Sequence, residues 1–236
     1  MHLLVTRPEP DGERTAAQLR ARGHDVRLAP LLRIEAVADA DLGGGPFAAI
    51  LLTSANGARA LATHLRRDEL LELPVLAVGR SSADAARAAG FADTVSADGD
   101  GGDLARLAAA CFAGSGRSLL YLSGEDRARD LAGELAVQGL AVRTVVIYRA
   151  VKAQNLTPEA LAALGGGGID GVLHFSRRSV ETYLDCAAEL LDRALKPIHF
   201  CLSARAAEPL KAAGAAVIRV APRPDEDALM ELVGRA

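Results

Sequence analysis

Short runs of apolar residues alternate along the chain with longer stretches in which apolar residues recur at helical spacing. The apolar runs are continuous, which is typical of strands that are buried on both faces of a sheet. Strands that alternate with helices predict βαβ units and parallel sheets. Helices are expected between most strands, for example over residues 14–21 and 82–89. The predicted strands are residues 3–6, 26–29, 49–53, 75–78, 94–96, 118–122, 142–147, 171–175, 198–202 and 217–220.

The second half of the chain repeats the first. Gly23 corresponds to Gly139, and the segment 75–90 corresponds to 199–214. Strands, glycines and polar turns follow one another in the same order in both halves. This order predicts a duplicated α/β unit with five strands in each copy.

Two segments are predicted to be connectors. Residues 36–46 and 150–168 each follow a copy of the first βαβ unit, and each contains a run of glycines. Glycine runs favour flexible loops over the interiors of helices or strands. We therefore expect the chain to pass from one domain to another at these two places.

Polar residues follow almost every predicted strand, where open parallel sheets bind their ligands. Serine and threonine at the start of a helix have a structural interpretation, because they cap free backbone N–H groups. The same helix ends could instead hold carboxylates or phosphates, with arginines as additional donors. A single arginine is more often a solvated surface residue, so both interpretations stay open. The turns are residues 6–8, 53–57, 79–82, 123–127, 148–149, 176–179 and 203–205.

Composition narrows the function further. A length of 236 residues suits one large or two small domains, and the net charge of −3 argues against general nucleic-acid binding. No apolar run reaches the roughly 18 residues of a membrane span, and the start of the chain lacks the features of a signal peptide. We therefore expect a cytoplasmic protein that binds neither membrane nor nucleic acid.

Metal and nucleotide sites have little support in the sequence. The three cysteines form no CxxC pair and the five histidines form no metal-binding motif, so no disulfide framework and no metal site is expected. Neither a dinucleotide-binding glycine motif nor a P-loop is present. An acidic, glycine-containing cluster at 98–103 lacks calcium-loop spacing and is interpreted as a loop.

Four segments, taken in this order, resemble uroporphyrinogen-III synthase. Each segment alone is weak evidence, but their order, the duplication and the length together are more specific. The resemblance extends from residue 3 to about residue 233. The segments are Thr6-Arg7-Pro8, Leu51-Leu52-Thr53-Ser54-Ala55-Asn56, Ala77-Val78-Gly79 and Val146-Ile147-Tyr148-Arg149.

The resemblance implies an α/β fold with two similar three-layer α/β/α domains. Each domain has a five-stranded parallel sheet, the domains are duplicated and swapped, and a two-stranded linker joins them. Residues 1–36 plus 152–236 would form the first domain and residues 37–151 the second. The family's active site lies in the cleft between the domains.

The resemblance also implies a reaction. The family is a carbon–oxygen hydro-lyase of porphyrin and heme biosynthesis that uses no cofactor and no metal. It closes hydroxymethylbilane, a linear tetrapyrrole with eight carboxylates, into uroporphyrinogen III with inversion of the terminal ring and loss of water. Without enzyme the substrate closes to the uninverted isomer, so the main task is orientation. A monomer that receives substrate transiently from hydroxymethylbilane synthase is expected.

Tyr148 matches the family's tyrosine and is the candidate catalytic residue. A phenol with a pKa near 10 stays protonated and can donate a hydrogen bond to the departing hydroxyl. Its alternative interpretation is a tyrosine at the edge of the core, packed under a loop. The candidate substrate-binding residues are Thr6, Arg7, Thr53, Ser54, Ser81, Ser123, Gly124, Ser176, Arg177 and Ser203.

One turn departs from the family pattern. The family often has a glycine and paired threonines where this chain reads Leu202-Ser203-Ala204-Arg205-Ala206-Ala207. Backbone donors survive this change, whereas a side-chain role for threonine does not. Arg205 is then expected to contact a carboxylate directly.

Two other functions remain open from the sequence. A non-catalytic two-domain sensor would bind a tetrapyrrole or another small polyanion without turnover. A periplasmic-type binding protein is the weaker alternative, because no signal sequence was found.

Overall fold

The computed structural model describes residues 1–127 and 129–234, which form two compact units. The terminal unit combines residues 1–33 with the described residues from 151 onward, and the central unit contains residues 34–150. The chain passes from one unit to the other after residues 33 and 150, close to the expected domain boundaries after residues 36 and 151. The domain boundaries themselves stay a prediction.

The terminal unit has a five-stranded sheet in the order β11-β10-β9-β1-β2. All of its pairings are parallel, and β1 from the first half of the chain lies directly beside β9 from the second half. This pairing is the swap that the resemblance implied. The strands are β1 (His2–Val5), β2 (Asp25–Leu28), β9 (Gly171–His174), β10 (Ile198–Cys201) and β11 (Ile218–Val220).

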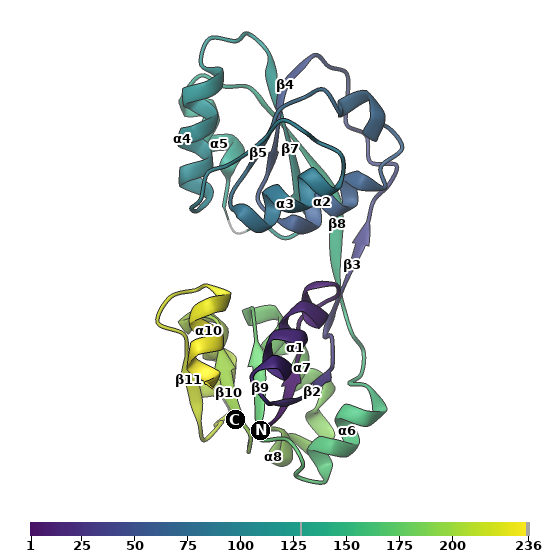
Figure 1. Cartoon of the computed structure of the whole chain (residues 1–236), viewed down its shortest axis with the longest axis vertical. Coiled ribbons are helices and arrows are strands. Elements are labelled where there is room, and N and C mark those ends of the chain that lie inside the picture. The colour runs from purple at the N-terminus through teal and green to yellow at the C-terminus, as the bar shows by residue number, and fades with distance from the viewer. Residues whose placement is uncertain (128, 235–236) are drawn as a thin grey trace. The chain divides into compact units, whose positions relative to one another are not determined.

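Helices cover both faces of this sheet (Figure 1). Because successive side chains of a strand point to opposite faces, Leu3 and Val5 pack with one helix layer and Leu4 with the other. The helices are α1 (Asp11–Ala21), α6 (Pro158–Gly165), α7 (Arg177–Cys186), the 3₁₀ helix η2 (Ala188–Leu190), α8 (Leu191–Ala194), α9 (Ala204–Ala212) and α10 (Glu226–Val233).

The central unit has a six-stranded sheet in the order β3-β8-β7-β4-β5-β6. Strands β4 to β8 pair in parallel, and β3 is added beside β8. The strands are β3 (Leu32–Ala36), β4 (Phe47–Leu52), β5 (Val75–Ala77), β6 (Thr94–Ser96), β7 (Ser118–Gly124) and β8 (Val142–Lys152).

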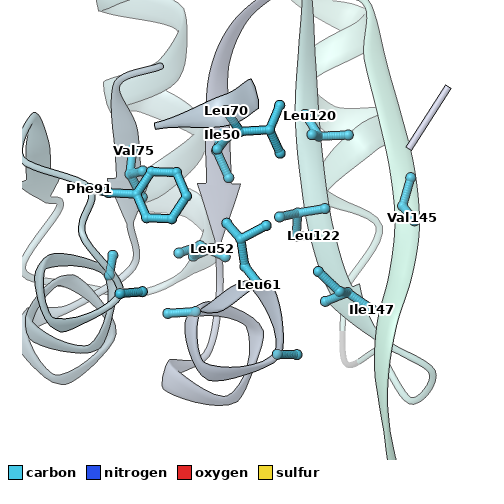
Figure 2. Packing of buried hydrophobic residues seen from close by; sticks show 14 of the residues in the cluster. Ile50, Leu52, Leu61, Leu70, Val75, Phe91, Leu120, Leu122, Val145 and Ile147 are labelled. Atoms are coloured by element: carbon cyan, nitrogen blue, oxygen red, sulfur yellow. The ribbon is translucent and has the colours of Figure 1, made fainter. Parts of the chain in front are cut away.

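The central sheet is also a middle layer between helices. Figure 2 shows one face, where Ile50, Leu52, Leu120 and Leu122 meet Leu61 of the first helix after β4. Full burial of one such leucine stabilises the fold by about 1.5–3 kcal/mol. The other face packs against the two helices that contain Leu104 and Leu131. The helices are α2 (Ala55–Ala62), the 3₁₀ helix η1 (Arg67–Leu70), α3 (Arg80–Ala88), α4 (Gly101–Phe112) and α5 (Leu131–Val137).

The predicted α/β fold class is confirmed, but the central sheet has six strands where five were expected, because β3 is added beside β8. Two local predictions are also wrong. The second connector is not a continuous loop, because Thr157 caps α6 within it by accepting a hydrogen bond from the backbone of Ala160. The acidic cluster at 98–103 is not a simple loop, because Asp100 and Asp103 form a capping box that starts α4. Among the described residues, no helix is long and apolar enough to cross a membrane.

Candidate functional site

A pocket of about 450 Å³ lies at the carboxyl ends of the central strands. It combines an apolar floor with hydroxyls, carboxylates and guanidinium groups. Four of the candidate residues from the sequence line it, together with residues that the sequence did not single out. The lining residues are Thr53, Ser54, Val78, Asp100, Gly101, Tyr121, Gly124, Asp126, Arg127, Arg129, Leu131 and Tyr148.

A bulge in β8 aims Tyr148 at this pocket. Ser123 pairs with Val146, but the next residue, Gly124, pairs with Tyr148, so Ile147 is an extra residue. An extra residue reverses the usual alternation of side chains. Ile147 and Tyr148 consequently pack against the same core cluster although they are adjacent in sequence.

Gly124 makes room for the ring of Tyr148, and Gly57 allows close packing against the backbone of Leu122. A Cβ on Gly124 would lie 2.7 Å from Cζ and 2.8 Å from the phenol oxygen of Tyr148. A Cβ on Gly57 would lie 3.9 Å from Cε1 of the ring and 3.2 Å from the backbone oxygen of Leu122. The phenol therefore lies almost directly on the backbone of Gly124, which gives this predicted binding residue a clear structural role.

The phenol of Tyr148 is held in its protonated form. Burial raises its pKa above the usual 10, and the nearby Tyr121 acts in the same direction. A hydrogen bond with Ser54 opposes these effects without cancelling them. Tyr148 is therefore a hydrogen-bond donor over the whole physiological range.

The adjacent residues Thr53 and Ser54 each hold one phenol. The Thr53 hydroxyl lies 3.0 Å from the phenol oxygen of Tyr121. Ser54 lines the pocket with Tyr148, lowers the pKa of that phenol, and also caps α2 by accepting a hydrogen bond from the backbone N–H of Asn56. The Ser54 hydroxyl therefore caps a helix, as its structural interpretation predicts, and also lines the pocket, as its functional interpretation requires.

Two arginines bring positive charge to the pocket. Arg129 pairs with Glu134 and lies across the N-terminus of α4, where a Cβ on Gly101 would meet its side chain at 3.1 Å. Arg127 also lines the pocket. Guanidinium groups are suitable donors for the carboxylates of a polyanionic ligand.

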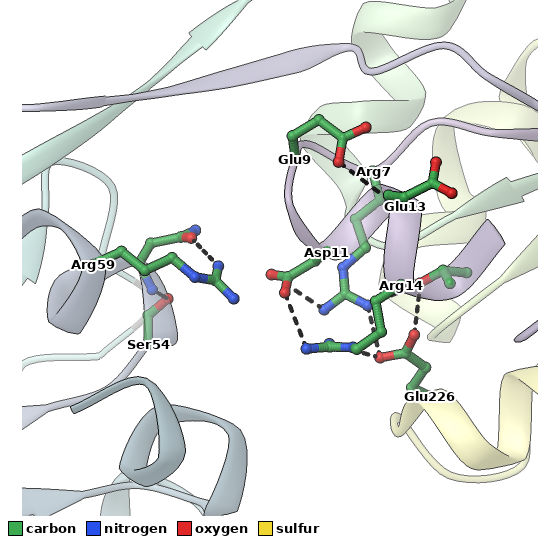
Figure 3. A network of polar contacts seen from close by, with 10 residues as sticks. Arg7, Glu9, Asp11, Glu13, Arg14, Ser54, Arg59 and Glu226 are labelled. Carbon is green, nitrogen blue, oxygen red and sulfur yellow. Dashed lines mark hydrogen bonds and ion pairs between the residues drawn. The ribbon is translucent and has the colours of Figure 1, made fainter. Parts of the chain in front are cut away.

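The corresponding edge of the terminal unit is occupied by its own side chains (Figure 3). Arg7 donates to Glu226 at 2.7 Å and to Thr15 at 3.3 Å, and it lies 3.7 Å from Asp11. Its guanidinium carbon is 4.9 Å from the ring centroid of Phe175. Arg7, predicted to bind substrate, is thus held by two carboxylates of its own unit.

Glu226 is ionised in this network. Burial alone would raise the pKa of its carboxyl, but hydrogen bonds from Thr15 and Arg7 and the charges of Arg7 and Arg14 outweigh burial and lower the pKa. Thr6 is likewise engaged, because its buried hydroxyl donates to the Leu173 carbonyl at 2.8 Å.

The remaining candidates are not among the residues that line this pocket. Ser176 and Ser203 cap α7 and α9, as their structural interpretation expected. Arg177 pairs with Glu181 and Glu208 on the surface. In the central unit, Ser81 is exposed in the first turn of α3, and Ser123 is buried with its hydroxyl 3.4 Å from the Val145 carbonyl.

The family model for uroporphyrinogen-III synthase HemD matches residues 13–231. The chain belongs to this family. Uroporphyrinogen-III synthase is a lyase of porphyrin biosynthesis that acts on a tetrapyrrole, and family membership supports this activity over the sensor that the sequence left open.

Solved structures are similar to this chain, and the first of them has the same fold. Uroporphyrinogen-III synthetase from Helicobacter pylori 26695 is 17% identical, covers 98% of this chain and 97% of its own, and has a TM-score of 0.69. Uroporphyrinogen III synthase from the extremely thermophilic bacterium Thermus thermophilus is 21% identical, covers 99% of this chain and 95% of its own, and has a TM-score of 0.42. No curated protein matches the chain.

Three polar residues of the pocket escaped the sequence reasoning for this synthase-family chain. Tyr121 lies inside a core strand, and its only signal is a polar phenol in an apolar run, which needs a partner when buried. Arg129 has no strand directly before it. Asp100 could have been found, because Asp100 and Asp103 have the spacing of a capping box.

Proposed function

We propose that this chain closes hydroxymethylbilane to uroporphyrinogen III with Tyr148 as the acid that assists loss of the terminal hydroxyl. The observation that supports this role is the protonated phenol of Tyr148, which lines the pocket beside the Ser54 hydroxyl and the arginine side chains. A carbon–oxygen bond breaks when the hydroxyl departs, and a donor at that oxygen lowers the barrier.

The proposed reaction consumes one proton when the hydroxyl leaves and releases one proton when the ring closes. The hydroxyl leaves as water with a proton from the acid, and the electrons of the pyrrole nitrogen give an azafulvene electrophile. The substituted carbon of the far ring attacks it to give a spiro intermediate. The bond from that carbon to its original bridging methylene then breaks and leaves a second azafulvene at this methylene, which the last bond will join. The inverted ring then forms the last bond through its free pyrrole carbon. That carbon releases a proton, which restores the acid.

Arg127 and Arg129 are proposed to hold carboxylates of the same substrate, together with Thr53. Ser176, Arg177, Ser203 and Arg205 of the terminal unit are proposed as further contacts, through side chains or neighbouring backbone N–H groups. Since the substrate is flexible and closes unaided to the wrong isomer, these contacts would act mainly by orientation. Thr6 and Arg7 are also proposed as substrate contacts, mainly through neighbouring backbone N–H groups, because their side chains already have partners.

The accompanying proposals concern the setting of the enzyme. A cytoplasmic monomer is proposed, without cofactor or metal. It would receive its unstable substrate transiently from hydroxymethylbilane synthase.

The test is an isomer assay with purified protein. Hydroxymethylbilane is added without nucleotide and with a chelator, and the products are oxidised and separated by chromatography. The type III isomer is expected to dominate, at a rate that the chelator does not change. Formation of the type I isomer alone, at the rate of the protein-free blank, would contradict the proposal. A sensor would give that second result while still binding the tetrapyrrole.

A further inference from the structure

Tyr121 is a buried phenol that the proposed chemistry has not yet used. It lies on β7, is 4% exposed, and its ring packs in the core between the sheet and the helices α4 and α5. Leu120 and Leu122 on either side belong to the cluster on the opposite face. Tyr121 therefore approaches the pocket from one face of the sheet, and Tyr148 packs with the cluster on the other.

The two phenols lie beside consecutive hydroxyls. Tyr121 is hydrogen-bonded to Thr53, and Tyr148 lines the same pocket as Ser54. This follows from strand alternation, because Leu51 and Leu52, the last residues of β4, already face opposite clusters. At the end of β4, Thr53 therefore lies with Tyr121 and Ser54 lies with Tyr148, and all four residues line one pocket.

The direction of the Tyr121–Thr53 hydrogen bond follows from acidity. The oxygens are 3.0 Å apart, and either one could donate by geometry alone. A phenol is a much stronger acid than an aliphatic alcohol, so the favoured arrangement has Tyr121 donating to Thr53. The proton of the Thr53 hydroxyl then remains available to an acceptor in the pocket.

We infer that Tyr121 is a positioning residue: its phenol fixes the Thr53 hydroxyl so that Thr53 donates to a carboxylate of the bound tetrapyrrole. This inference rests on the proposed function. It divides the pocket into two pairs, in which Tyr121 and Thr53 hold the substrate and Ser54 and Tyr148 serve the departing hydroxyl.

The first measurement compares Tyr121→Phe with the parent enzyme. Phenylalanine keeps the packed ring and removes only the hydroxyl. The KM for hydroxymethylbilane is expected to rise about five- to tenfold, the effect of losing one typical hydrogen bond, here the one that orients Thr53. The kcat is expected to stay within about twofold, because the contact is equal in the ground state and the transition state. Equilibrium binding of uroporphyrinogen III should weaken by the same factor as KM rises.

Substitutions at Thr53 test whether Tyr121 acts through this residue. Thr53→Val should raise KM about as much as Tyr121→Phe, and the double variant should be no worse than either single one, because the two residues act as one unit. Thr53→Ser keeps the hydroxyl and should restore a KM close to that of the parent. Simple loss of packing would not give this pattern.

Tyr183→Phe is the matched control. Tyr183 is a buried tyrosine of the terminal unit whose phenol donates to the Ala194 carbonyl at 2.9 Å. Its removal should leave both KM and kcat unchanged. An unchanged KM in Tyr121→Phe, or additive effects of Tyr121→Phe and Thr53→Val, would overturn the inference while the isomer assay of the parent still supported the proposed function. A parent that forms no type III isomer would overturn both.

Discussion

The carboxyl edges of the two sheets have similar sequences and different local organisation. In the central unit, Thr53, Ser54 and Tyr148 line an open pocket that also contains guanidinium groups. In the terminal unit, Arg7 is bound by Glu226 and Asp11 of its own unit. A duplicated layout has therefore produced one edge whose hydroxyls and phenol line a pocket and another whose first arginine is buried in a network of its own unit.

The difference teaches that a turn motif does not reveal whether its groups are free. The partner of Arg7 lies 219 residues away in sequence, on the last helix. Arg7 is largely buried between its two carboxylates, whereas the paired arginines Arg129 and Arg177 are about half exposed. A buried guanidinium has less to offer an incoming carboxylate, because the ligand must compete with charges already in place. Three variants test this contrast.

The largest effect is expected from Gly124→Ala, which attacks the central edge. The added methyl group would occupy the space of the Tyr148 ring and push the phenol from its position. Displacement of a positioned group by about 1 Å can cost roughly 100-fold in rate, so kcat should fall by about that factor. Steady-state kinetics measure it. Gly165→Ala at the end of α6, where a Cβ meets nothing within 4 Å, is the control and should match the parent. A kcat within about twofold of the parent in Gly124→Ala would show that the position of the ring is unimportant.

A smaller effect is expected from Tyr148→Phe, which removes only the phenol oxygen. The kcat should fall about tenfold with little change in binding of the ring product, because a positioning enzyme keeps most of its advantage without one donor. In the parent, kcat should stay level through about pH 9 and decline only above the raised pKa of Tyr148, where the donor proton is lost. The variant should lack this alkaline decline. An unchanged kcat would remove Tyr148 from the proposed role.

The smallest effect is expected from Glu226→Gln, which breaks the internal network of the terminal edge. Loss of a charged acceptor for Arg7 and Thr15 should lower the free energy of unfolding by about 1–2 kcal/mol at neutral pH. Because the folded carboxyl has a lowered pKa, its contribution is complete above the ordinary value of 4.5 and disappears as the pH falls through the folded value. The parent and the variant should therefore converge in acid.

Denaturant unfolding at several pH values measures this difference. Glu13→Gln is the control, since Glu13 forms an exposed pair with Arg20 and should contribute less than about 0.5 kcal/mol. Equal stability of Glu226→Gln and the parent at neutral pH would remove the contrast between the two edges.

The sequence predicted most of the fold, because strands buried on both faces need continuous apolar runs. It did not predict β3, whose residues Leu32, Arg33, Ile34 and Glu35 alternate and are only partly buried. Such a strand forms by pairing with β8, which is distant in sequence, and a local sequence pattern does not predict pairing over that distance.

The candidate site was less predictable than the fold. Thr53, Ser54, Gly124 and Tyr148 were found through strand ends and the family resemblance, and they do line one pocket. The bulge at Ile147 that directs Tyr148 to the pocket could not be predicted from residues 142–147. A continuous apolar segment does not specify which face of the sheet each residue takes. Long-range ion pairs such as that of Arg7 are equally invisible to local patterns.

The exchange of strands between the two halves has a consequence for synthesis of the chain. Strand β1 leaves the ribosome long before β9, which is its neighbour on one side of the terminal sheet. Until residue 171 has been made, Leu3, Leu4 and Val5 lack the surface that finally buries them. The central unit is complete at residue 150, so we expect it to fold before the terminal sheet can close around that first βαβ piece.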